Sequence, residues 1–254
     1  MISFNLKRIF EPVNSLILPA FVKCKICCRR KALDEISICT VCNREIELMT
    51  AGYFDCEICG RFLQDERDEK LCPQCRESKP PFTAARALGP YCGILKYAIH
   101  NLKFCGDRKL AVPLGKMLGK KISRLGQNIE VDIVVPVPMF FYREKRRGFN
   151  QSALLADEVS SELSKPLSEG LLQKQWDTIP QTELTFNKRS INLKDSFCVS
   201  AEFNIRGKSV LLVDDIITTG STAAECSKEL LNAGAKQVIV GVVAAGVNNK
   251  HFAS

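Results

Sequence analysis

Residues 210–222, VLLVDDIITTGST, constrain the fold of this chain more than any other stretch. Four apolar residues lead into two adjacent acids, and a run of threonines and serine around one glycine then opens a helical pattern. A continuous apolar run of this kind is typical of a strand that is buried on both faces. The backbone amides of a glycine-containing loop at a helix N-terminus form a site for anions. The stretch therefore predicts a strand, an anion-binding loop and a helix, in that order.

The polar groups of this stretch suit two parts of one ligand. The amides and hydroxyls of residues 218–222 can donate hydrogen bonds to a phosphate, and Gly220 lets the backbone approach it closely. The carboxylates of Asp214 and Asp215 repel phosphate, and they instead accept hydrogen bonds from hydroxyls or join the shell of a divalent metal. A phosphate with vicinal hydroxyls a short distance away is a ribose 5-phosphate, which we therefore expect here.

The surrounding segment alternates between helix and strand patterns. Helical patterns cover 93–104, 108–122, 152–163, 184–193 and 220–233. Apolar runs indicate strands at 129–138, 208–213 and 236–245, and Gly89-Pro90 suggests a hairpin over 83–92. This alternation predicts an α/β fold with a parallel sheet and helices on both faces. Ligands of such sheets bind beyond the carboxyl ends of the strands, where we expect the two acids.

Eight of the 13 cysteines form four Cys-x-x-Cys pairs near the N-terminus. The ligand candidates are Cys24, Cys27, Cys39, Cys42, Cys56, Cys59, Cys72 and Cys75. Two such pairs supply four thiolates, which complete a tetrahedral zinc site and leave no position open for catalysis. A disulfide framework would need an oxidising compartment, and the sequence shows no evident export signal. We expect two structural Zn²⁺ ions, with consecutive pairs as the simpler grouping and interleaved pairs as the alternative.

Pro80 and Pro81 mark the end of the cysteine-rich region. We expect a double zinc-binding module over residues 1–82 and an α/β domain over residues 83–254. The apolar run VNSLILPAFV is too short to cross a bilayer, and it predicts a short docking helix before the first cysteines. A cytoplasmic protein without a membrane span is the resulting expectation.

The net charge of +8 is concentrated in one part of the chain. Residues 96–147 hold 12 Lys/Arg and 4 Asp/Glu, which accounts for the whole of it. A local basic surface attracts phosphate groups, although a solvated face is the alternative. One basic group is Lys103, Arg108 and Lys109; the other is a predicted loop over 141–151 that holds Arg143, Lys145, Arg146 and Arg147. Aromatic residues in and beside this loop offer stacking surfaces for bases.

The stretch 210–222 resembles the signature of type I phosphoribosyltransferases over its whole length. The resemblance implies that Asp214 and Asp215 hold the ribose hydroxyls of phosphoribosyl pyrophosphate (PRPP), which binds with Mg²⁺. It implies 5-phosphate contacts for Thr218, Thr219, Gly220, Ser221 and Thr222. The predicted basic loop is similar in position to the family's catalytic loop. This implies a catalytic role for Arg143, Lys145, Arg146 and Arg147, which would stabilise the charge on the leaving pyrophosphate.

The cysteine-rich front and three further segments narrow this resemblance. The segments are LKFCGDRKLAVPLGKML (102–118), RRGFNQSALLA (146–156) and QTELTFNKRSINLKDSF (181–197). Together they are similar to the ComF family of competence proteins, which implies handling of single-stranded DNA in natural transformation. PRPP, single-stranded DNA and proteins of the DNA-uptake or recombination machinery are the implied partners. One alternative is an active phosphoribosyltransferase with an unidentified acceptor, since no acceptor pocket is recognisable. Another is an adaptor that docks proteins through its zinc module.

Overall fold

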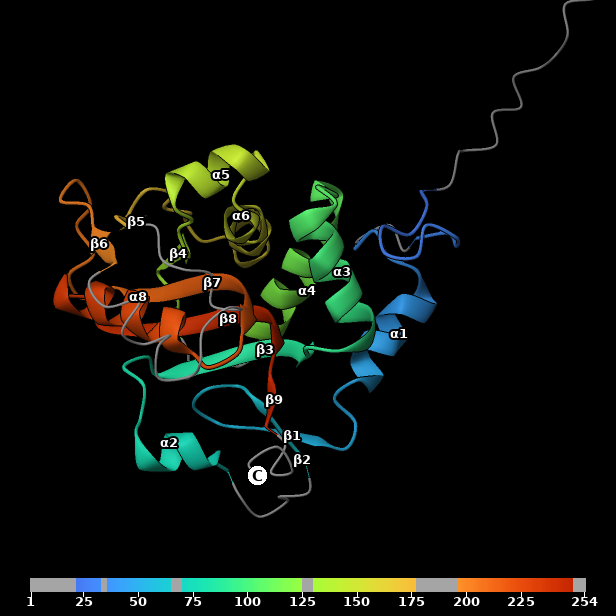
Figure 1. Ribbon diagram of the computed structural model, residues 1–254, viewed down its shortest axis with the longest axis horizontal. Helices are drawn as coiled ribbons and strands as arrows, with labels where there is room; N and C mark the ends of the chain where they lie inside the picture. Colours follow the sequence, from blue (N-terminus) through green and yellow to red (C-terminus); the bar gives the residue numbers. More distant parts are fainter. Residues whose placement is uncertain (1–21, 33–35, 65–69, 125–129, 177–195, 249–254) are drawn as a thin grey trace, which may run out of the picture.

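The computed structural model describes residues 22–32, 36–64, 70–124, 130–176 and 196–248. A four-stranded parallel sheet lies at its centre (Figure 1). The strands, in spatial order, are β3 (Ala84–Pro90), β8 (Gln237–Ala245), β7 (Ser209–Ile217) and β4 (Ile133–Pro136). The two central strands are apolar and buried along most of their length, as parallel strands covered on both faces must be. The predicted α/β fold is confirmed.

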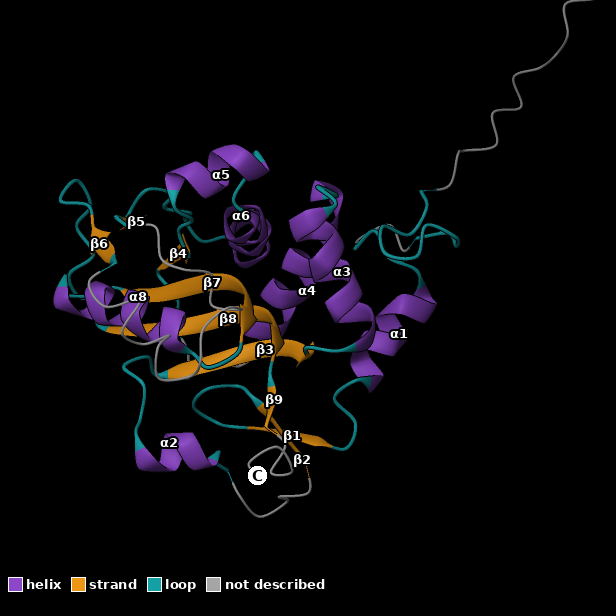
Figure 2. Cartoon of the chain, in the orientation of Figure 1, coloured by secondary structure: helices purple, strands orange, loops and turns teal. Residues whose placement is uncertain are grey.

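Side chains of the central strands point alternately into two apolar cores, one on each face of the sheet. One core joins Leu211 and Val213 to α3 (Gly93–Phe104), α4 (Ala111–Ser123) and α6 (Gln151–Leu163). The other core joins Val210 and Leu212 to α8 (Ser221–Asn232) and to the small sheet of β5 (Leu172–Lys174) and β6 (Phe197–Val199). A 3-10 turn, Arg108–Leu110, connects α3 to α4. Helices therefore cover both faces of the sheet (Figure 2).

The two cysteine-rich segments contribute to opposite cores. The first, with α1 (Thr40–Leu48), packs with α3 and α4. The second holds β1 (Tyr53–Asp55), β2 (Phe62–Gln64) and α2 (Pro73–Glu77), and its cysteines belong to the core of α8. Strand β2 also pairs in parallel with β9 (Val247–Asn248), just after β8. The domain boundary after residue 82 stays a prediction.

The predicted hairpin over residues 83–92 is wrong. Strand β3 runs straight through the Gly-Pro pair, and Gly89 and Pro90 stay in register with Ala244 and Ala245 of β8. Because β3 is an edge strand and Pro90 is its last residue, the missing amide hydrogen of the proline is tolerated.

The acids lie inside a strand that is longer than predicted. Strand β7 continues to Ile217 instead of ending at Val213, because β8 pairs with it as far as Ala245. Its other neighbour, β4, ends at Pro136, opposite Val213. Asp214 and Asp215 therefore remain in β7 but extend beyond the carboxyl end of β4.

The basic segment expected as a loop is largely helical. Helix α5 (Phe141–Arg147) contains no glycine or proline, and it ends at Gly148, whose left-handed φ of +81° suits a helix C-terminus. The helices predicted near 93–104, 108–122, 152–163 and 220–233 are confirmed. The helical pattern at 184–193 and the docking helix before the first cysteines lie outside the described residues. Within the described ranges, no helix combines the length and apolar character that a bilayer crossing requires.

Candidate functional site

A cavity of about 410 Å³ lies beyond the carboxyl end of β4. It is built from segments far apart in the sequence. Strand β7, the loop after it and the start of α8 supply one side, while α3, α5 and the first turn of α6 supply the others. The polar lining includes Asp214, Asp215, Thr218, Thr222, Lys103, Arg143, Arg147, Gln151 and Ser152.

The first turn of α6 holds both carboxylates. Ser152 Oγ donates a hydrogen bond to Asp214 Oδ1 at 2.7 Å, and Gln151 Nε2 donates to Asp215 Oδ1 at 3.4 Å. Asn150 caps the helix, because its side-chain oxygen accepts a bond from the Ser152 amide at 3.0 Å. The cap fixes where the helix begins, and so it fixes where both donors point.

Lys103 is the charged partner of the deeper acid. Its Nζ forms an ion pair with Oδ2 of Asp215, whose side chain is only 4% exposed. Burial alone would lower the pKa of Lys103, but the Asp215 and Asp214 carboxylates raise it above its usual value. Burial and the neighbouring Asp215 raise the pKa of Asp214 to about 7, although Lys103 and Ser152 act against this rise. One fixed positive charge therefore faces two acids that differ in their surroundings.

The loop of residues 218–222 lies beside the acids. Gly220 adopts a left-handed φ of +82° at the N-cap of α8, which a residue with a side chain rarely does. Thr219 Oγ1 lies 2.9 Å from Ser221 Oγ and accepts a hydrogen bond from the Ser221 amide at 3.3 Å. A small cavity of about 20 Å³ is lined by this loop together with Asp214. The two acids and the loop thus meet at one place, as the sequence predicts.

The predicted basic residues separate into two groups. Arg143 and Arg147 line the large cavity, whereas Lys145 and Arg146 are exposed and do not line it. The Arg147 guanidinium lies over the ring of Phe104 at 5.5 Å and donates a hydrogen bond to Gln151 Oε1 at 2.6 Å. Burial, together with the charges of the neighbouring arginines, lowers the pKa of Arg147, and Asp215 opposes this.

The second basic group is divided as well. Lys103 lines the cavity, but Arg108 and Lys109 do not. Arg108 instead donates a hydrogen bond to the carbonyl of Gly148 at 2.7 Å and lies over the Phe149 ring at 4.7 Å. Arg108 therefore fixes the end of α5.

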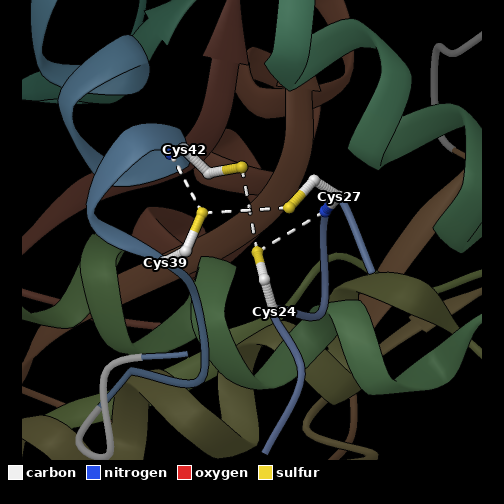
Figure 3. Close-up of side chains that lie close together, drawn as sticks. All are labelled: Cys24, Cys27, Cys39 and Cys42. Atoms are coloured by element: carbon white, nitrogen blue, oxygen red, sulfur yellow. Dashed lines mark hydrogen bonds between the residues drawn. The ribbon is translucent and has the colours of Figure 1, made fainter. Parts of the chain in front are cut away.

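Each cysteine tetrad fits a metal ion. The first tetrad is Cys24, Cys27, Cys39 and Cys42, and the second is Cys56, Cys59, Cys72 and Cys75. Within each, all four sulfurs lie within 4.8 Å of one another. The Cys24–Cys42 and Cys27–Cys39 sulfur pairs are both 3.8 Å apart (Figure 3). A tetrahedral ion with Zn–S bonds of about 2.3 Å spaces its ligand sulfurs by about 3.8 Å. The consecutive grouping is therefore confirmed, and the interleaved alternative is wrong.

Arg61 supports the second tetrad, and the sequence did not single it out. Its Nε donates to Cys59 Sγ at 3.3 Å, and its Nη2 donates to Cys72 Sγ at 3.3 Å and to Gln74 Oε1 at 2.7 Å. Four thiolates around one divalent ion leave a net negative charge, which a guanidinium at this position offsets. The two tetrads thus differ in their outer surroundings.

Comparison with known proteins places this arrangement in a family. The profile of the phosphoribosyl transferase domain matches residues 118–251. The DNA utilization protein YhgH of Salmonella typhimurium is 31% identical over 220 residues, which cover 85% of this chain and 94% of YhgH. Competence protein F of Haemophilus influenzae is 28% identical over 222 residues, which cover 86% of this chain and 94% of that protein.

The chain belongs to the ComF family. Another relative of this ComF-family chain is the competence protein ComFC of Bacillus subtilis. The two chains are 26% identical over 203 residues, which cover 78% of this chain and 79% of ComFC. The sequence of the ComF-family chain singles out the acids, the loop of residues 218–222 and the tetrads, but it does not indicate which residues contact the acids. Only a weak pattern in the sequence points to Gln151 and Ser152: they are polar residues in the first turn of a helix that follows Asn150. No spacing rule connects Lys103 to Asp215.

Proposed function

We propose that this chain binds PRPP with Mg²⁺ in the large cavity and handles single-stranded DNA in natural transformation. One observation supports the first part: two carboxylates, the glycine-containing loop of residues 218–222 and half-buried cations all line the same cavity. Asp214 and Asp215 accept hydrogen bonds from the ribose hydroxyls, and residues 218–222 hold the 5-phosphate through amides and hydroxyls.

The cations on the other side of the cavity suit the pyrophosphate. Lys103, Arg143 and Arg147 come from α3 and α5 and line the same space as the acids. In a partly buried site, their charges act on a phosphate more strongly than they would in water. Lys145 and Arg146 stay at the surface, and we assign them to the DNA backbone instead.

Two observations support the DNA part of the proposal. The relatives are named a DNA utilization protein and competence proteins. The excess positive charge of the chain falls in residues 96–147, which contain most of α3 and the whole of α4 and α5. Proteins of the DNA-uptake or recombination machinery are further proposed partners. We propose zinc as the metal of both tetrads, and the cytoplasm as the location, because a reducing compartment keeps thiolates available for zinc.

Calorimetric titration with PRPP and Mg²⁺ tests the pocket. Asp214→Asn is the variant of choice, because the amide keeps the shape of the carboxylate and the substitution leaves the Lys103–Asp215 ion pair in place. Losing charge-assisted hydrogen bonds to ribose hydroxyls should weaken binding by about 10- to 100-fold. Asp157→Asn, an exposed acid on α6, is the matched control and should bind like the wild type. An unchanged Kd for Asp214→Asn would refute the assignment.

An active phosphoribosyltransferase is a second candidate. The cavity lining also includes the aromatic residues Tyr91, Phe104 and Phe140, which offer faces for a planar acceptor. Release of pyrophosphate from PRPP, measured with single bases and with oligonucleotides as acceptors, decides between the two candidates. Release that depends on an acceptor would favour the transferase, and no release above the acceptor-free rate would favour binding alone.

A further inference from the structure

Helices α3 and α5 expose large aromatic side chains next to the cavity. Tyr142 is 70% exposed, Phe104 67%, Phe141 66% and Tyr97 56%. Exposing an aromatic side chain to water is energetically unfavourable, because each ring leaves a large apolar area in contact with solvent. Their concentration on two neighbouring helices therefore indicates a surface that binds something flat or apolar.

The same two helices are strongly basic. Helix α5 has the sequence FYREKRR, with one acid among four cations. Helix α3, GILKYAIHNLKF, carries no acid at all, and its outward face includes Lys96 and His100 beside Tyr97. A partner that is negatively charged and also offers planar apolar faces fits both properties. Single-stranded nucleic acid has this chemistry, because phosphates alternate with bases whose faces are free.

The two helices form one continuous surface. The Arg147 guanidinium at the end of α5 lies over Phe104, and the Phe104 ring lies 5.0 Å from that of His100. At the other end of α5, the ring of Tyr142 lies 5.7 Å from the rings of both Phe140 and Phe141. Figure 1 shows the end of α5 near the end of α3. Aromatic groups therefore flank the cations of α5 on both sides.

We propose that Tyr97, Phe104, Phe141, Tyr142, Lys145 and Arg146 form an aromatic–basic strip along which single-stranded nucleic acid binds. Bases stack on the aromatic rings, and backbone phosphates contact Lys145 and Arg146. This inference rests on the proposed function, and it adds where the strand lies. Phe104 lines the cavity as well as the strip, so the strand passes the mouth of the PRPP site. The two ligands therefore influence each other's binding.

Duplex DNA does not suit the strip. Its bases are paired and stacked on one another, so their faces are not available to Phe104 or Tyr142. An acidic protein would satisfy Lys145 and Arg146, but it offers no regular series of planar groups to the aromatic rings. The strip therefore predicts a preference for single strands that persists when the salt concentration is raised.

Fluorescence anisotropy with a labelled single-stranded oligonucleotide tests the strip. Phe104→Ala and Tyr142→Ala should each weaken binding by about 5- to 150-fold, the range for loss of one base–aromatic stack. Both side chains are mostly exposed, so both variants should fold. Phe54→Ala, which removes an exposed aromatic on β1, is the matched control and should leave affinity unchanged. Arg146→Gln should lower the slope of log K against log salt by about 0.7, the value of one phosphate contact.

A second oligonucleotide separates stacking from charge. An abasic strand of equal length keeps the phosphates but has no bases, so the wild type should bind it more weakly than the ordinary strand. The wild type and Phe104→Ala should bind the abasic strand with the same affinity. Equal wild-type affinity for abasic and ordinary strands would overturn the strip. Strong wild-type binding that neither aromatic substitution weakens would also overturn the strip, while the DNA part of the proposed function would stand. A wild type that binds no single strand would overturn both.

Discussion

Replacing Lys103 with methionine should destabilise the fold through the acid it leaves behind. The side chains of Lys103 and Asp215 are 20% and 4% exposed, so the pair is largely removed from water. Removing one partner of a buried pair costs about 3–5 kcal/mol, because the other charge stays buried without compensation. We expect about 3 kcal/mol here, since Lys103 retains some contact with solvent. For a chain of this size, this corresponds to a fall in Tm of about 6–12 °C.

Thermal unfolding of Lys103→Met, Asp215→Asn and the double variant, all with zinc present, measures this effect. The double variant should be clearly more stable than the sum of the two single losses predicts, with a coupling of about 2 kcal/mol. Methionine keeps the length and the apolar stem of lysine, so packing changes little. If the stability losses of the two single variants are additive, or if Lys103→Met lowers Tm by less than about 2 °C, the Lys103–Asp215 ion pair does not stabilise the fold.

Three further predictions concern the metal sites, the backbone and pH. Elemental analysis should find two zinc ions per chain. Cys24→Ser and Cys56→Ser should each remove one ion, because the two tetrads share no ligand. Loss of both ions in either variant would contradict this prediction. Gly60→Ala should destabilise the fold by about 2 kcal/mol, since its φ is +65° and a new Cβ would lie 2.7 Å from the Ala85 carbonyl oxygen. Gly52→Ala has a similar φ but open space around it, so urea unfolding should show a smaller loss for it. PRPP should bind more weakly as pH falls through about 7, because burial raises the pKa of Asp214 to about 7 and only the ionised carboxylate accepts both hydroxyl bonds. Calorimetry at pH 7 in buffers of different ionisation enthalpy should then show proton release on binding, and its absence would refute this assignment of Asp214.

The features that sequence predicted correctly depend on short-range patterns. Apolar runs marked β7 and β8, helical periodicity marked α3, α4, α6 and α8, and cysteine spacing marked both tetrads. Each pattern is local, because strand, helix and metal-ligand geometry all repeat within a few residues. The acids and the loop of residues 218–222 were singled out as a predicted site for the same reason, since they follow one another within a single stretch.

The features that sequence missed depend on tertiary packing. Nothing local indicates that Lys103 of α3 reaches Asp215 of β7, or that Ser152 reaches Asp214. The hairpin was predicted because Gly89-Pro90 is a common turn signal, but pairing with β8 outweighs that local preference. The helical turn of α5 decides that Arg143 and Arg147 line the cavity while Lys145 and Arg146 do not. The sequence predicted a loop here, and a loop has no such regular turn.

A crystal structure of the chain with PRPP and Mg²⁺ would show whether the large cavity is the PRPP site. We expect the 5-phosphate within hydrogen-bonding distance of the amides of residues 218–222, and the ribose hydroxyls on Asp214 and Asp215. The pyrophosphate should lie beside Lys103, Arg143 and Arg147. PRPP bound outside this cavity, or turned so that its 5-phosphate faces the arginines, would contradict the proposed PRPP site.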